Sequence, residues 1–158
     1  MQKITRLSSL IALAIILGIL ESFIPVFNIP GIKLGLANIV IITTLYIYSF
    51  KEAVLVSLLR ILFISVLRTG FGLNLYFSLT GSILSLFSMF IAKKIGFSVI
   101  GVSIIGSTCH IIGQIIIAII LLNTNLTYYL PFMIILSIIT GLIIGYISKE
   151  NIKFLENK

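Results

Sequence analysis

The sequence predicts an all-α polytopic membrane protein, a six-transmembrane-helix bundle that forms a single domain over residues 1–158. Hydrophobic residues make up 59% of the chain and charged residues 9%, and the mean hydropathy is +1.28. Soluble domains are about half apolar and a quarter charged, so this composition indicates an integral membrane protein. Because each crossing takes about 20 residues, little of the chain is left for a soluble domain.

Six apolar blocks define the expected helices, and turn-forming or charged residues separate them. The blocks cover residues 7–24, 34–50, 53–67, 75–92, 97–122 and 128–148. Pro25 closes the first block, and Lys51 and Glu52 stand between the second and third. Lys93 and Lys94 close the fourth block. The last two blocks are separated by residues 123–127, which are mostly polar.

The basic residues predict the orientation of these helices. Arg60 lies within the third block, and the other basic residues lie outside the apolar blocks. If the N-terminus is cytoplasmic, Lys33 and Arg68 lie outside and eight basic residues lie inside: Lys3, Arg6, Lys51, Lys93, Lys94, Lys149, Lys153 and Lys158. This asymmetry follows the positive-inside rule, so we expect a multi-pass membrane protein with both termini cytoplasmic. The net charge of +7 therefore does not indicate a nucleic-acid partner.

The segment PGIKLGLANI, residues 30–39, places Lys33 at the expected outer end of the second helix. Unpaired N–H groups and the helix dipole favour anions there. Lys33, with Arg68, is therefore a candidate to attract an anionic ligand group, although Lys33 equally fits anchoring to lipid headgroups. Glu21, at the outer end of the first helix, fits either an ion pair with Lys33 or Arg68 or a contact with a cationic ligand group.

Arg60 is the most informative charge, because an ionised side chain near the bilayer centre costs about 2.5 to 3.5 kcal/mol on insertion scales. We expect it to face a partner or an aqueous cavity and to take part in a binding site. The fifth block carries a second polar feature at helical spacing: Ser103, Gly106, His110, Gly113 and Gln114. His110 and Gln114 fit either ligand binding or interhelical hydrogen bonding. Asn38 and Asn74, near outer helix ends, either line a site or cap backbone groups.

Small residues form faces on which a neighbouring helix backbone can approach closely. Ala14 and Gly18 form such a face on the first helix, and it fits either internal packing or contact with another membrane subunit.

The residue types that are absent argue against ATP hydrolysis and against metal-dependent catalysis. The chain contains no phosphate-binding P-loop, no Asp and only four Glu. We therefore expect no metal site, no cofactor and no catalytic residues.

Four segments together resemble one known family: PGIKLGLAN (30–38), FKEAVLVSLLRILF (50–63), GVSIIGSTCHIIGQ (101–114) and YYLPFMIILSIITGLIIG (128–145). This is the bacterial "Gx transporter" family, also labelled heptaprenyl diphosphate synthase component I, which is similar to the substrate-binding S components of energy-coupling factor transporters. The resemblance spans residues 8–148. It implies an outward-facing pocket, a lid that includes Pro30 and Gly31, and a contact through Ala14 and Gly18 with a membrane coupling subunit driven by separate ATPases.

The resemblance and the polar residues predict a substrate-binding subunit that takes up a small, partly anionic and partly apolar molecule, such as a vitamin, a flavin, or a quinone or isoprenoid precursor. The alternative is a non-catalytic accessory protein of an isoprenoid or quinone pathway or of a redox complex. Prenyl-chain synthesis uses Asp-rich Mg²⁺ sites, and the chain has no Asp, so the synthase label does not predict an enzyme.

Overall fold

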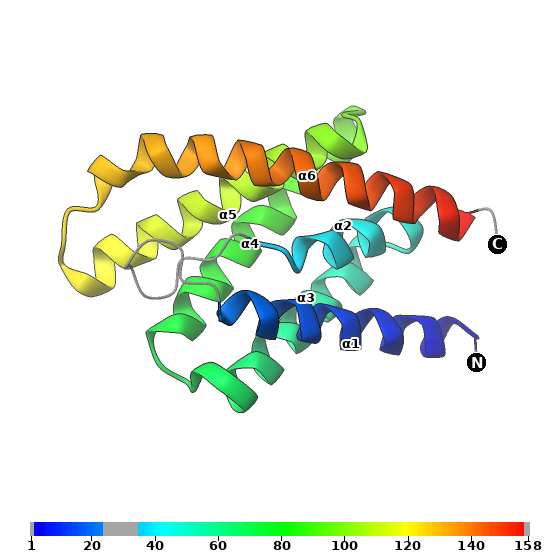
Figure 1. Ribbon diagram of the computed structural model, residues 1–158, viewed down its shortest axis with the longest axis horizontal. Helices are drawn as coiled ribbons and strands as arrows, with labels where there is room; N and C mark the ends of the chain where they lie inside the picture. Colours follow the sequence, from blue (N-terminus) through cyan, green and yellow to red (C-terminus); the bar gives the residue numbers. More distant parts are fainter. Residues whose placement is uncertain (1, 24–34, 157–158) are drawn as a thin grey trace.

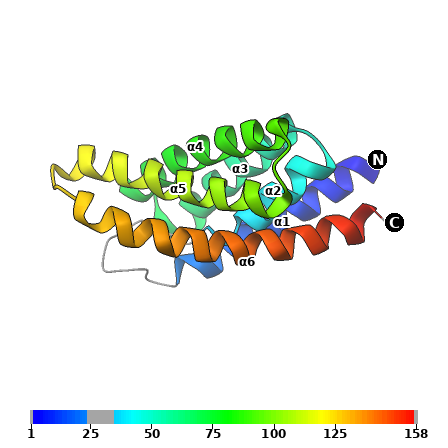
Figure 2. The same cartoon turned by 90° about the horizontal axis from the view of Figure 1, so that it is seen from above.

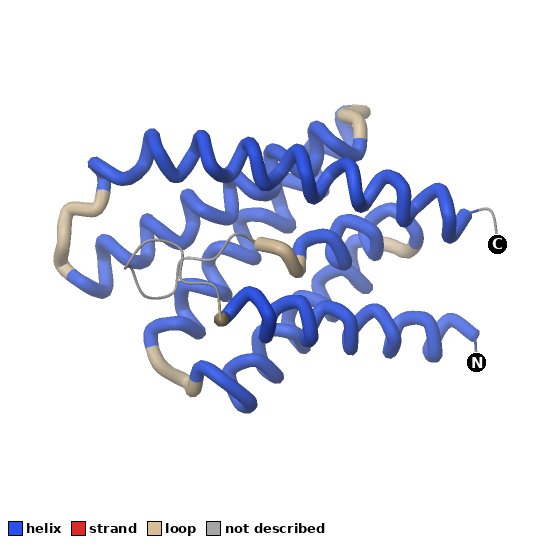
Figure 3. Tube along the Cα trace, viewed as in Figure 1, coloured by secondary structure: helices blue, strands red, loops and turns tan. Residues whose placement is uncertain are grey.

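The computed structural model describes residues 2–23 and 35–156, and every element within them is helical (Figure 3). The α-helices are α1 (Gln2–Ser22), α2 (Asn38–Ile47), α3 (Phe50–Ile64), α4 (Leu73–Ile95), α5 (Val99–Leu122) and α6 (Leu130–Glu156). A π-helical segment, η1 (Ser65–Thr69), continues α3, and a short 3-10 turn, η2 (Thr127–Tyr129), precedes α6. The all-α prediction is therefore confirmed for the described residues.

Four segments are long and apolar enough to cross a membrane: Lys3–Ser22, Leu73–Ile95, Val99–Leu122 and Thr127–Leu155. The second predicted span is helical only over Asn38–Ile47 among the described residues, 10 residues or about 15 Å at 1.5 Å per residue. That length is half of a hydrocarbon core of about 30 Å. The third predicted span is divided into α3, of 15 residues, and η1. Length and composition therefore support a membrane protein with four candidate spans.

The helices lie roughly along one axis, and both termini are at the same end of the bundle (Figures 1 and 2). Helices α4, α5 and α6 pack one against the next, α1 packs on α3, and α2 packs between α3 and α6. Capping explains two helix ends: the Ser98 hydroxyl accepts from the Gly101 N–H at 3.2 Å, and Gly96 ends α4 with a φ of 99°. Glycine adopts this left-handed backbone conformation most easily, because it has no Cβ.

Glycines set the spacing of the long helices. A Cβ at Gly141 or Gly145 of α6 would lie 2.8 Å from the Cα of Ile104 or Ile100, respectively, on α5. A Cβ at Gly113 of α5 would lie 2.9 Å from the Thr80 carbonyl oxygen of α4. Real Cβ atoms are not found so close to a backbone, so these contacts require glycine. These glycines of α5 and α6 thus serve packing within the chain.

Polar contacts tie the helices together at the end that carries the termini. The Lys3 ammonium lies 2.7 Å from a Glu52 carboxylate oxygen, which joins α1 to the start of α3. The Lys93 ammonium donates to the Leu45 carbonyl at 2.6 Å, which joins the end of α4 to α2. Basic residues that are far apart in the sequence therefore gather at one end of the bundle.

The Lys3–Glu52 pair predicts an acid dependence of stability. Hydrogen bonds from Lys3 first and Ser49 second lower the pKa of Glu52 from 4.5 to about 2. Because the pKa is lowered by folding, the stabilisation is present above pH 4.5 and is lost as the pH falls towards 2. We expect Glu52→Gln to lower the unfolding midpoint at about pH 6 and to have a smaller effect at about pH 3. A difference between the two proteins that does not change with pH would contradict this assignment.

Candidate functional site

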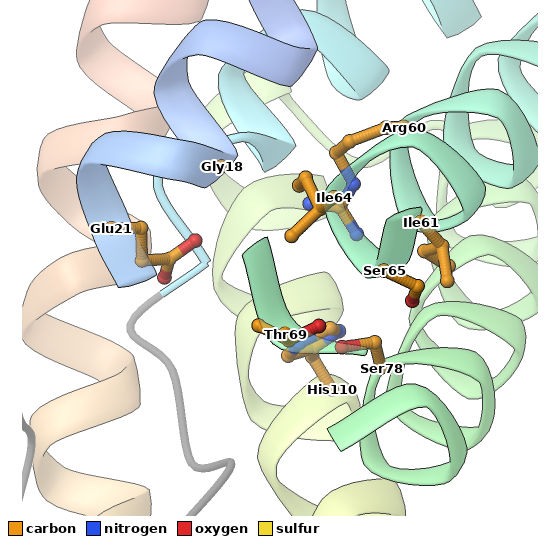
Figure 4. Close-up of a pocket in the computed structure, with 9 residues that line it drawn as sticks. All are labelled: Gly18, Glu21, Arg60, Ile61, Ile64, Ser65, Thr69, Ser78 and His110. Atoms are coloured by element: carbon orange, nitrogen blue, oxygen red, sulfur yellow. The ribbon is translucent and has the colours of Figure 1, made fainter. Parts of the chain in front are cut away.

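A small polar cavity lies where five elements meet, and three sequence-predicted residues line it: Glu21 of α1, Arg60 of α3 and His110 of α5 (Figure 4). The remaining lining residues are Gly18, Ile61, Ile64, Ser65, Thr69 and Ser78. Its volume is about 10 Å³, which is room for about one water molecule. Charged groups of both signs and three hydroxyl groups thus surround one point inside an otherwise apolar bundle.

Arg60 is buried, with 5% of its surface exposed. Its Nη2 donates to the Ser82 hydroxyl of α4 at 2.9 Å, and the Glu21 carboxylate stabilises its charge electrostatically. The Arg60 Nε is also buried, and it has no hydrogen-bond partner in the described part of the chain. A buried donor without a partner costs about 1 to 3 kcal/mol, so the guanidinium retains a donor for a further polar group.

Glu21 connects the end of α1 to the start of α2. Its Oε1 accepts hydrogen bonds from the backbone N–H of Gly35 and, at 3.2 Å, from that of Leu36. The side chain is 2% exposed, and in Figure 4 it points from α1 towards the cavity. The carboxylate is therefore held between two backbone donors and the positive charge of Arg60.

His110 and Gln114 are adjacent on one face of α5. The His110 Nε2 and Gln114 Nε2 atoms are 3.2 Å apart, and both residues are buried. All five members of the polar stripe predicted for this helix are buried, and Gly81 of α4 packs against both His110 and Gln114. The stripe therefore faces protein, as its composition predicts, and His110 extends it to the cavity.

The cavity has the chemistry of a binding site for a polar group. It offers a guanidinium donor, a carboxylate acceptor, an imidazole and hydroxyls. Among residues 2–23 and 35–156, no three His, Cys, Asp or Glu side chains gather in a group able to hold a metal ion.

The sequence profile of one family, described as heptaprenyl diphosphate synthase component I, matches residues 10–151. The chain belongs to this family. The match covers the segments that carry the sequence resemblance and all the lining residues of the cavity. No curated protein and no solved structure matches the chain. The family resemblance predicted from the sequence is thus confirmed, and the likeness to energy-coupling factor S components stays a prediction.

Three further residues predicted for the site in this component I family member, Arg68, Asn38 and Asn74, do not line the cavity. Arg68 of η1 turns to the end of α1, where its Nε is 3.4 Å from the Ser22 hydroxyl and its guanidinium is 4.2 Å from the Phe23 ring centre. Asn38 is 1% exposed, and within residues 2–23 and 35–156 neither of its amide atoms has a hydrogen-bond partner. The Asn74 Oδ1 likewise has none. Neither asparagine caps its helix.

The partner-subunit contact expected through Ala14 and Gly18 stays a prediction, and in the structure both residues pack within the chain. Ala14 is fully buried and packs in a cluster with Val40 and Val56. Gly18 faces Ile64 and Arg60 of α3. Because α3 covers this face, it is not available to another subunit in this structure. The predicted lid residues Pro30 and Gly31, and Lys33, lie outside the described residues.

Sequence reasoning missed most of the hydroxyls around the cavity. Ser65 and Thr69 lie in η1, and no residue pattern in the sequence predicts a π-helical turn there. Ser78 and Ser82 of α4 are four residues apart, so they share one helix face. This spacing can be seen in the sequence, but it fits either polar contacts inside the protein or close helix packing. The position of Arg60 in the structure shows that Ser82 makes a polar contact.

Proposed function

We propose that this membrane protein is a substrate-binding subunit that captures a small molecule with a polar head and an apolar body. The observation that carries the proposal is the cavity in which Glu21, Arg60 and His110 meet. Ionisable groups inside a membrane bundle are costly and usually mark a substrate path. Arg60 would receive an anionic ligand group, and His110 and the hydroxyls would fix its orientation. The proposed role is binding and transfer, without catalysis.

The size of the cavity limits how such a ligand binds. A volume of about 10 Å³ admits about one water molecule, so a vitamin-sized ligand requires the walls to move apart. The end of α1 and η1 form two of the walls, and they contact each other through Arg68, Ser22 and Phe23. We expect these two elements to separate on binding.

The finer architecture is part of the same proposal. We expect α3 with η1 to form a fifth crossing and α2 to enter the membrane halfway, which gives a six-helix arrangement of the S-component type. The gathering of basic residues at the end with both termini supports a cytoplasmic position for that end in a bacterial plasma membrane. A coupling subunit with separate ATPases would then bind a face other than the one that carries Ala14.

The family description supports an alternative, a non-catalytic accessory protein that works with a prenyl diphosphate synthase or a redox complex. Affinity purification from membranes separates the two. Co-purification of a membrane coupling subunit and ATPases would support the binding subunit. Co-purification of a soluble prenyl synthase or redox partner in their place would support the accessory role.

Ligand-dependent thermal stabilisation tests the proposal directly. We expect one class in a panel of vitamins, flavins, quinone precursors and prenyl phosphates to raise the unfolding temperature of the purified protein. Ser78→Ala removes one cavity hydroxyl and is expected to weaken binding about fivefold, the value of one hydrogen bond. Ser88→Ala removes a hydroxyl on the same helix that bonds only to the Ser85 carbonyl, so it should bind like the native chain. Absence of stabilisation by every ligand would contradict the proposal.

A further inference from the structure

Two grooves on the surface of the chain meet at Phe50. The first, of about 350 Å³, lies at the end of the bundle that carries the termini, and Lys93, Lys94 and Tyr48 line it together with Phe50. The second, of about 220 Å³, runs between α3 and α4. Phe50 lines both grooves, and its ring is 4.6 Å from the Phe90 ring and 6.2 Å from the Phe87 ring. The two grooves therefore adjoin at Phe50, with lysines at one end and apolar side chains at the other, and together they are called the path.

The basic end has charge to offer to a ligand. Lys94 is exposed and Lys93 is half-buried, and within residues 2–23 and 35–156 neither lysine forms an ion pair with a carboxylate. Glu52 is the acidic residue nearest to Phe50 in the sequence, and its carboxylate is already paired with Lys3. The path thus begins with positive charge that no described carboxylate neutralises.

The apolar end has the length of one lipid chain in one leaflet. Its lining on α3 extends from Phe50 to Ile61, twelve residues whose ends are about 16 Å apart along the helix axis at 1.5 Å per residue. Half of a hydrocarbon core of about 30 Å is about 15 Å. Of its lining residues only Ser57 and Ser82 are polar, and the Ser82 hydroxyl accepts a hydrogen bond from Arg60. The groove therefore suits a hydrocarbon chain that extends from the basic end towards the bilayer centre.

We propose that this path binds one anionic phospholipid, with its phosphate on Lys93 and Lys94 and an acyl chain between α3 and α4. Basic pockets between membrane helices on the cytoplasmic side are suited to anionic headgroups. Charge complementarity at the mouth and the match between groove length and leaflet depth favour a bilayer lipid. The lipid would fill the space between α3 and α4, directly beside Ser82 and Arg60 of the candidate site.

Native mass spectrometry of the full chain tests the proposal, after equilibration in mixed micelles of phosphatidylglycerol and phosphatidylcholine in equal amounts. We expect the protein to retain one phosphatidylglycerol. Lys94→Gln should weaken this retention about fivefold, as expected for one basic residue near a membrane surface. Lys149→Gln removes an exposed lysine of α6 that does not line the path and should retain lipid like the native chain.

A second pair of variants tests the apolar end. Leu58→Trp fills the groove, whereas Leu62→Trp places the same side chain one turn further along α3 at a residue that does not line it. Both residues are similarly exposed, at 42% and 48%, so the folding of both variants should be affected equally. We expect only Leu58→Trp to lose the lipid.

Four outcomes would overturn the proposal. Equal retention of phosphatidylcholine, or equal loss in Lys94→Gln and Lys149→Gln, would show that the lysines do not select the headgroup. An isoprenoid monophosphate that displaces phosphatidylglycerol at equal concentration would assign the path to a different amphiphile. A dimer that excludes the lipid would assign it to a second copy of the chain.

Discussion

Arg60→Met is expected to destabilise the protein by about 1 to 3 kcal/mol, the usual cost of leaving buried polar groups without a partner, because it removes the donor to the Ser82 hydroxyl and a positive charge that interacts with the buried Glu21 carboxylate. Methionine keeps much of the arginine length, so the change mainly removes charge and hydrogen bonding. Glu21 would keep its two backbone donors but lose the positive charge that faces it. Unfolding in a single detergent, followed by temperature or denaturant, measures the loss.

A double-mutant cycle with Glu21→Gln distinguishes this explanation from a simple packing defect. Glutamine still offers an oxygen to the Gly35 and Leu36 N–H groups but carries no charge. We expect the double variant to be more stable than the sum of the two single effects predicts, because it leaves no uncompensated charge. Strictly additive effects would show that the two charges are not coupled.

Arg68→Met provides the matched control. Arg68 is exposed, and among the described residues its side chain contacts the Ser22 hydroxyl and the Phe23 ring at the end of α1; such contacts contribute about 0.5 to 1 kcal/mol. A loss at Arg68 equal to the loss at Arg60 would contradict the special cost of the buried charge.

Hydropathy predicted the all-α character of the described residues better than it predicted where each helix ends. The sixth apolar block stops at residue 148, yet α6 continues to Glu156, because a helix can leave the membrane without ending. The second block covers residues 34–50, but its helix is only Asn38–Ile47. Hydropathy measures the affinity of a residue for lipid, whereas capping and backbone geometry decide where a helix ends.

For the candidate site too, the sequence indicates which side chains need polar neighbours, but it does not show which of them meet in the fold. Arg60, Glu21 and His110 were candidates because a charged or polar group in an apolar helix requires a polar neighbour. The structure brings these three to one cavity. It leaves Arg68, Asn74 and Asn38 away from it, since the contact of η1 with the end of α1 and the packing of α2 depend on residues distant in the sequence. Side-chain type alone indicates a need for polar contact, and the tertiary structure decides which residues meet.

The close contact between α4 and α5 at Gly113 makes a larger side chain there strongly destabilising. Gly113→Val is expected to cost about 3 kcal/mol, at the upper end of the usual range for overpacking. Its Cβ would lie 2.9 Å from the Thr80 carbonyl oxygen and 3.0 Å from the Gly81 Cα. Both are backbone atoms, so no rotamer change relieves the clash and the two helices must separate. Gly113→Ala has the same Cβ without the branch and should fall between the native chain and the valine variant.

Ile116→Val is the matched control for this prediction, because Ile116 is on the same helix and 51% exposed. It introduces valine without a new contact and should change the free energy of unfolding by less than about 0.5 kcal/mol. The separation of α4 from α5 in Gly113→Val also moves Ser78 away from His110 across the cavity. We therefore expect Gly113→Ala, which remains folded, to bind ligand more weakly than Ile116→Val. Equal stability of Gly113→Val and Ile116→Val would contradict the close contact, whereas equal binding by folded variants would show that the contact supports the fold without setting the site.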